Sequence, residues 1–282
     1  MPIYEETYRP WHGHTVTQPR TAWVIGKTGI QLLWKRGLIL FLLLSTLPFL
    51  VRAVQIYIMS RAGDITEALP AARAFQINAG FFLKFLQGQV FYLILVLIFT
   101  GAGLIANDRK FKALSIYFSK PVGFWDYIGG KFMTISAYGL MVTLVPGWLL
   151  FLTGVFLDQD ASFLRDYYWV PLAMLAVVAV LLISLGGLVL ALSAFSQSTR
   201  TAAILYFGVL TLPELLRAML GRIPSLGLFS LQAVIKQIGA ACFGQPLPYN
   251  FSVWLGALLL ALLVGGCIAV LRWRVKPTEV VK

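Results

Sequence analysis

The sequence contains few charged residues, and acidic ones are the scarcest. Charged side chains make up 12% of its 282 residues, about half of the ~25% that is usual in soluble domains. Residues of the hydrophobic class reach 59%, more than one soluble core of this chain length can bury. The composition excludes an ordinary soluble protein and predicts an all-α integral membrane protein.

Histidine and cysteine are also scarce, and their scarcity excludes several kinds of site. The two histidines, His12 and His14, both lie in the polar first segment, so they cannot form an internal catalytic triad. The two cysteines, Cys242 and Cys267, are expected on opposite sides of the membrane, which disfavours a disulfide. Because the acidic residues are scattered as well, we expect neither an enzyme nor a metal site.

Basic residues outnumber acidic ones by 23 to 11, which gives a net charge of +12. Such an excess indicates nucleic-acid binding when the basic residues form one soluble face. Here they lie at the ends of apolar runs, which is typical of anchoring on the positive, cytoplasmic side of a membrane. We therefore expect membrane lipid, and no nucleic acid, as a partner.

Six apolar runs are long enough to cross a bilayer, which takes about 20 residues. They cover residues 37–58, 81–106, 129–157, 169–195, 201–220 and 252–273. Six crossings put both termini on one side, and the larger share of Lys and Arg falls on that side. The pattern predicts a multi-pass protein of a cell membrane with both termini in the cytoplasm.

The segment before the first span has a different pattern. Residues 20–36 predict a helix with basic residues such as Lys27 on one side and apolar residues such as Leu33 on the other. A helix of this kind lies on the membrane surface. We therefore divide the chain into a cytoplasmic tail with an interfacial helix, residues 1–36, and a six-span domain, residues 37–282.

Residues 104–131 form a charged island between two apolar runs. Each of its first charged residues, Asp108, Arg109 and Lys110, would cost roughly 2.5–3.5 kcal/mol at a bilayer centre, so the island lies outside the hydrocarbon. Its basic residues place it in the cytoplasm. Since residues 106–117 contain neither Pro nor Gly, we expect them to form one short helix.

The connection between spans five and six is too apolar for an ordinary loop and too short to span twice. Its apolar residues recur every three or four positions, which predicts helical pieces that dip into the outer leaflet and are buried against protein. Before it, Glu214 and Arg217 are spaced for an ion pair on one helix face, although a proton or substrate site at Glu214 is an alternative. The residues assigned to this outer hairpin are Glu214, Arg217, Leu231 and Ile235.

The sixth span carries a small residue at every fourth position. This spacing lets a second helix approach closely. Packing within this chain and contact between subunits would both use such a face, and the sequence favours neither. The residues are Ala257, Ala261, Gly265 and Ala269.

The charged island resembles the first cytoplasmic loop of the type-2 family of ABC exporter permeases. That family shows an acidic–Arg pair after the second span, a short helix, a Ser/basic–Pro–Val turn and Gly-Lys at the next span. The matching residues are Asp108-Arg109, 113–118, Ser119-Lys120-Pro121-Val122 and Gly130-Lys131, and residues 193–200 resemble the family's second loop. The chain departs from the pattern at Lys112-Ala113, where Gly-Thr is common, and at Phe124, where a basic residue is common.

The resemblance implies a permease subunit of the bacterial inner membrane that moves a substrate, with export as the expected direction. Its implied partners are a second copy or a related permease and two copies of a separate ABC ATPase, which would bind ATP and Mg²⁺, so that this chain holds no cofactor. The implied ATPase contact comprises Asp108, Arg109, Lys110, Phe111, Leu114, Phe118 and Pro121, with Gln197 and Arg200 as a minor contact.

Two other classes of function stay open. A secondary transporter carries functional charges near the middle of the membrane, whereas Glu214, Arg217, Arg52 and Lys84 all lie toward the predicted outer end. A membrane anchor, or a force-transmitting subunit of an assembly or motility complex, would use the same fold without a substrate. A partner ATPase would favour the permease over both.

Overall fold

The computed structural model describes residues 21–34, 36–61, 77–119, 122–158, 162–219 and 224–275. Within these ranges every regular element is a helix. Six stretches are long and apolar enough to cross a membrane: Leu38–Ser60, Ala79–Lys110, Phe124–Leu157, Phe163–Phe195, Thr199–Met219 and Val253–Arg274. The all-α, six-span architecture is confirmed, although the third and fourth spans begin several residues earlier than expected.

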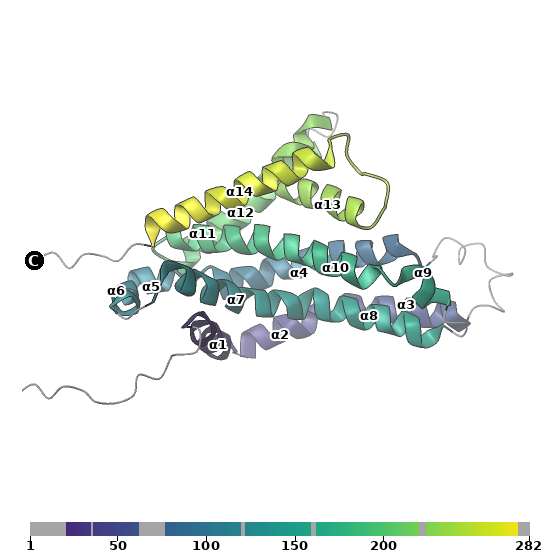
Figure 1. Cartoon of the computed structure of the whole chain (residues 1–282), viewed down its shortest axis with the longest axis horizontal. Coiled ribbons are helices and arrows are strands. Elements are labelled where there is room, and N and C mark those ends of the chain that lie inside the picture. Colours follow the sequence, from purple (N-terminus) through teal and green to yellow (C-terminus); the bar gives the residue numbers. More distant parts are fainter. Residues whose placement is uncertain are drawn as a thin grey trace, which may run out of the picture.

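The second, third and fourth spans form the centre of the molecule, where they run side by side (Figure 1). Within one strongly apolar stretch of 18 residues in each of these spans, 56%, 44% and 61% of the residues are buried, against 11%, 17% and 17% in the corresponding stretches of the first, fifth and sixth spans. The central elements are α4 (Ala79–Gly101), α7 (Phe124–Val142), α8 (Leu144–Leu157), α10 (Val170–Leu181), the π-turn η3 (Leu182–Gly186) and α11 (Gly187–Phe195). The peripheral elements are α2 (Arg36–Ser45), α3 (Leu47–Arg61), α12 (Thr199–Met219) and α14 (Val253–Arg274).

Prolines mark two of the breaks within spans. Pro48 lies in the first turn of α3 and Pro146 in the first turn of α8, where a missing N–H is tolerated because first-turn donors have no partner within the helix. The break before α3 leaves the Ser45 carbonyl free to accept a hydrogen bond from Gln89 Nε2 at 3.1 Å. This buried bond joins the first span to the second.

The two ends of the bundle carry different short helices. Figure 1 shows α1 (Thr21–Leu33), α5 (Ala106–Lys110) and α6 (Ala113–Phe118) at one end, which we call the α6 end. Toward the opposite end, the α13 end, lie α9 (Ser162–Tyr167), η4 (Pro224–Phe229) and α13 (Leu231–Cys242). α13 packs on α10 and α14, so the expected outer hairpin is helical and is buried against protein.

Helix α1 crosses α7 through glycines. A Cβ on Gly130 of α7 would lie 2.7 Å from Ile25 Cβ, and one on Gly26 of α1 would lie 2.8 Å from Met133 Sδ, so no larger residue fits without displacement. The hydroxyl of Tyr138 donates to the Ile30 carbonyl at 2.6 Å. The expected polar face is exposed at Lys27 and Gln31, whereas Arg20 and Lys35 lie outside the described residues.

Candidate functional site

The expectation of one continuous helix over residues 106–117 is wrong. α5 ends at Lys110, α6 begins at Ala113, and Lys112 between them has φ 54°, in the left-handed region that costs a non-glycine residue about 1–2 kcal/mol. α5 instead continues the second span. The type-2 exporter permeases that the charged island resembles often have glycine at the position of Lys112. Glycine adopts this conformation without strain.

One buried hydroxyl from the fourth span holds the turn between α4 and α5. Ser193 Oγ accepts hydrogen bonds from the N–H groups of Ile105 at 3.1 Å and Ala106 at 3.0 Å, and donates to the Ala102 carbonyl at 2.8 Å. Backbone groups released by a break need partners when they are buried. Ser193 supplies them. The sequence does not distinguish it from Ser184, the other serine in the apolar run of the fourth span.

Asp108 is directed into the protein. Its Oδ2 lies 2.7 Å from Lys131 Nζ and accepts a hydrogen bond from the Tyr127 hydroxyl at 2.6 Å. The two charged side chains are only 17% and 9% exposed. Tyr117 of α6 lies against Lys131, with Nζ 5.7 Å from the ring centroid, and burial, followed by the Asp108 charge, raises the pKa of Tyr117. Asp108 therefore ties the second span to the third.

The neighbouring residues of α5 bind two further spans. Arg109 donates from Nη1 to the Ala194 carbonyl at the end of α11. Asn107 Oδ1 accepts from Thr199 Oγ1 at 2.9 Å, at the start of α12. A displacement of α5 would thus be passed directly to the third, fourth and fifth spans, and this set of contacts is called the α5 junction below.

The predicted contact residues divide into an internal and an exposed group. Leu114 is buried and Phe118 is half-buried against Tyr127, so neither side chain projects from α6, whereas Phe111 is 71% exposed. The exposed residues are Lys110, Phe111, Gln197 and Arg200. Ile116, 65% exposed, was missed because the break at Lys112 rotates α6 away from the face that a continuous helix would present. Pro121 lies outside the described residues.

A cavity of about 480 Å³ lies between α1 and the α5 junction. Apolar residues such as Ile25 and Leu32 line it from α1, and Asp108, Lys131 and Thr199 supply polar groups from the junction. Helix α1 therefore borders the same polar groups that hold α5 in place.

At the α13 end, the predicted ion pair is present. Arg217 Nε donates to Glu214 Oε2 at 3.1 Å, and Ser230 Oγ donates to the same oxygen at 2.6 Å. Ser230 also caps α13, accepting from the Ala233 N–H at 3.3 Å. Leu231 and Ile235 follow on α13, where Leu231 is half-buried and Ile235 is buried. Glu214 thus joins α12 to the helix of the hairpin.

The small residues of the sixth span do not pack against the part of the chain that the structure describes. A Cβ on Gly265 would have no atom within 4 Å. The buried positions of α14 are others, among them Leu260, Cys267 and Leu271. All four members of the small-residue face are exposed: Ala257, Ala261, Gly265 and Ala269.

Comparison with known proteins identifies one family. The family model described as "ABC-2 family transporter protein" matches residues 27–238, more than half of the chain, from within α1 to within α13. No curated protein matches this sequence.

Proposed function

We propose, because the chain belongs to the ABC-2 transporter family, that it is the permease subunit of an ABC transporter driven by a separate ATPase subunit. Membership of the family makes it a multi-pass transport component of a membrane. The observation that carries the ATPase partnership is the α5 junction, where one short helix is bonded to three other spans. It lies beside α6, whose Ile116 is exposed.

The proposed coupling starts at α6. An ATPase that closes on ATP and Mg²⁺ would press on Phe111 and Ile116, the two large exposed apolar side chains of this segment. α6 packs through Tyr117 against Tyr127 of α7 in an edge-to-face arrangement, with ring centroids 5.2 Å apart. Because Tyr127 also bonds Asp108 of α5, a push on α6 would move the second and third spans together.

Co-purification with the ATPase tests this coupling. A hot-spot residue can contribute 2 kcal/mol or more to an interface, so Phe111→Ala with Ile116→Ala should weaken ATPase affinity roughly thirtyfold or more. Leu114→Ala is the matched variant, because it removes a buried side chain of the same segment and should lower thermal stability rather than affinity. Undiminished ATPase binding by the double variant would place the contact elsewhere.

Binding of an ATPase by the wild-type chain is a second test of the proposal. If it binds no ATPase under conditions where the folded protein is recovered, the force-transmitting subunit or the secondary transporter would be the better reading. If the ATPase does bind, transport assays in vesicles with the ATPase added on one side would distinguish export from import. Export is the direction proposed here, from the resemblance of the charged island to exporter permeases.

The proposed orientation puts both termini and the α6 end in the cytoplasm of a bacterial cell. The support is charge, because exposed Lys110, Lys112 and Arg272 gather at this end, as cytoplasmic ends do. In a background without Cys242 and Cys267, an impermeant thiol reagent added to intact cells should label Lys84→Cys but not Lys112→Cys. Labelling of Lys112→Cys from outside would reverse the orientation.

The proposed assembly contains two permeases, either two copies or one copy with a related chain, and two ATPases. The exposed small residues of α14 support it, since such faces let helices pack closely in membranes. In the cysteine-free background, Ala261→Cys should cross-link between copies and Leu262→Cys, an exposed neighbour, should not. Equal cross-linking at both positions would exclude this face as the contact.

A further inference from the structure

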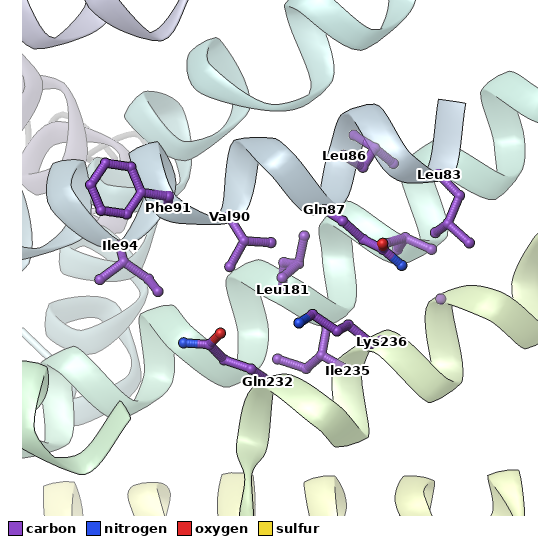
Figure 2. A pocket seen from close by; sticks show the side chains of 12 residues that line it. Leu83, Leu86, Gln87, Val90, Phe91, Ile94, Leu181, Gln232, Ile235 and Lys236 are labelled. Carbon is purple, nitrogen blue, oxygen red and sulfur yellow. The ribbon is translucent and has the colours of Figure 1, made fainter. Parts of the chain in front are cut away.

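A second cavity, of about 170 Å³, lies between α4, α10 and α13 in the half of the molecule at the α13 end (Figure 2). Most of its lining is apolar, including Leu86, Val90 and Ile94 from α4 and Leu181 from α10. An apolar cavity of about 150 Å³ can hold a benzene-sized ligand. This one can therefore hold a short stretch of hydrocarbon chain.

Three polar side chains reach into the same space. Figure 2 shows Gln87 directed from α4 toward α13, and Gln232 and Lys236 directed from α13 toward α4. Within the part of the chain that the structure describes, none of these three side chains takes part in a hydrogen bond or an ion pair, and the cavity lining contains no acidic residue. The site therefore offers one cation and two amide donors that have no partner among the described residues.

Glu214 does not form an ion pair with Lys236. Glu214 lies within electrostatic range of Lys236, but its oxygens are bonded by Arg217 and Ser230. A cation beside apolar walls within a membrane is costly unless an anion or water compensates it. Phe91, which borders the cavity, is 60% exposed, so the site opens toward the surrounding lipid.

We propose that this cavity binds one anionic phospholipid of the leaflet at the α13 end. Part of an acyl chain occupies the apolar space, and the phosphate accepts from Lys236, with Gln87 and Gln232 donating to the headgroup. The charge complementarity at Lys236 and the access from lipid favour this occupant over a polar solute. The proposal goes beyond the proposed function, because it requires neither the ATPase nor a transported substrate.

Lipid titration of the full chain tests the headgroup contact. The protein, stripped of lipid in neutral detergent, is titrated with phosphatidylglycerol and with phosphatidylcholine of identical acyl chains, and one-to-one complexes are counted by native mass spectrometry. A charge-assisted bond predicts about tenfold tighter binding of phosphatidylglycerol. Lys236→Gln should abolish this preference, and Lys236→Arg, which keeps the charge, should retain it.

A matched cation separates the site from general surface charge. Lys84 is exposed on α4 near the same end but does not line the cavity, so Lys84→Gln should retain the preference. Equal wild-type binding of both lipids, a preference that survives Lys236→Gln, or an equal loss in Lys84→Gln would each overturn the proposal.

A cavity-filling variant tests the acyl-chain contact. Val90→Phe should weaken binding of both lipids by a similar factor, since it occupies the apolar space that both tails share. Unchanged affinity in that variant would show that the acyl chain does not occupy the cavity. Tighter binding of a free fatty acid than of phosphatidylglycerol would assign the site to a carboxylate amphiphile and overturn the phospholipid.

Discussion

A polar cluster lies at each end of the bundle. The two clusters contain the same kinds of chemical group but connect different elements of the fold. Each has a carboxylate, a cation and a hydroxyl donor: Asp108 with Lys131 and Tyr127 at the α6 end, and Glu214 with Arg217 and Ser230 at the α13 end. The first joins two central spans. In the second, the ion pair lies within one turn of α12, and only the hydroxyl comes from the hairpin.

The side chains of the two ion pairs also differ in burial. The paired side chains are 17% and 9% exposed at the α6 end, and 24% and 28% exposed at the α13 end. Partly exposed pairs close in sequence contribute little to stability, whereas breaking a buried pair leaves an uncompensated charge. The comparison indicates that the α6 end holds the central spans together, while the α13 end only attaches the hairpin.

The largest loss of stability is expected when one partner of the buried Asp108–Lys131 pair is removed. Lys131→Met should lower the free energy of unfolding by about 3–5 kcal/mol, because Asp108 is left buried without its cation. Thermal unfolding in detergent, followed by size-exclusion chromatography, measures the effect. Asp108→Asn combined with Lys131→Met should recover part of the loss, and a double variant that is no more stable than Lys131→Met would contradict a direct pair.

A second test concerns the turn beside that pair. Ser193→Ala leaves the N–H groups of Ile105 and Ala106 without their acceptor, which should cost about 1–3 kcal/mol of stability. Ser184→Ala is the control, because Ser184 is equally buried but bonds only carbonyls of its own span. Equal thermal shifts in the two variants would show that Ser193 has no special role in the break.

Breaking the Glu214–Arg217 pair at the α13 end should have a smaller effect on stability. Glu214→Gln should lower stability by about 1 kcal/mol or less, as expected for a partly exposed pair, with transport retained. Unfolding temperature and transport rate are measured on the same preparation. Loss of transport without loss of stability would instead make Glu214 a proton or substrate site. The cluster at the α13 end would then have a direct role in transport.

The smallest effect concerns the backbone at Lys112. Lys112→Gly relieves the left-handed strain and should leave stability unchanged or raise it by up to about 1 kcal/mol. Lys112→Val should destabilise, since a β-branched residue tolerates positive φ poorly. Chemical denaturation of both variants decides the sign, and a destabilising glycine would show that the Lys112 side chain contributes more than its conformation costs.

Local patterns predicted most of the fold. The six spans, the helix before them and the helical hairpin all follow from runs of apolar residues and their spacing, and the Glu214–Arg217 pair lies within one helix. The exposed members of the α6 end, such as Phe111 and Arg200, were also in the predicted set. The partners of Asp108 and Arg109 were not predicted, because they lie on other spans.

The sequence by itself determined which segments cross the membrane, because the cost of placing charge in hydrocarbon depends on each residue and its near neighbours. Only the tertiary structure decided that Asp108 pairs with Lys131, that Thr199 bonds Asn107 from 92 positions away and that Ser193 permits the break before α5. These contacts depend on how the spans pack, and no short pattern contains that information. The same holds for the left-handed Lys112, which turns Leu114 inward and Ile116 outward.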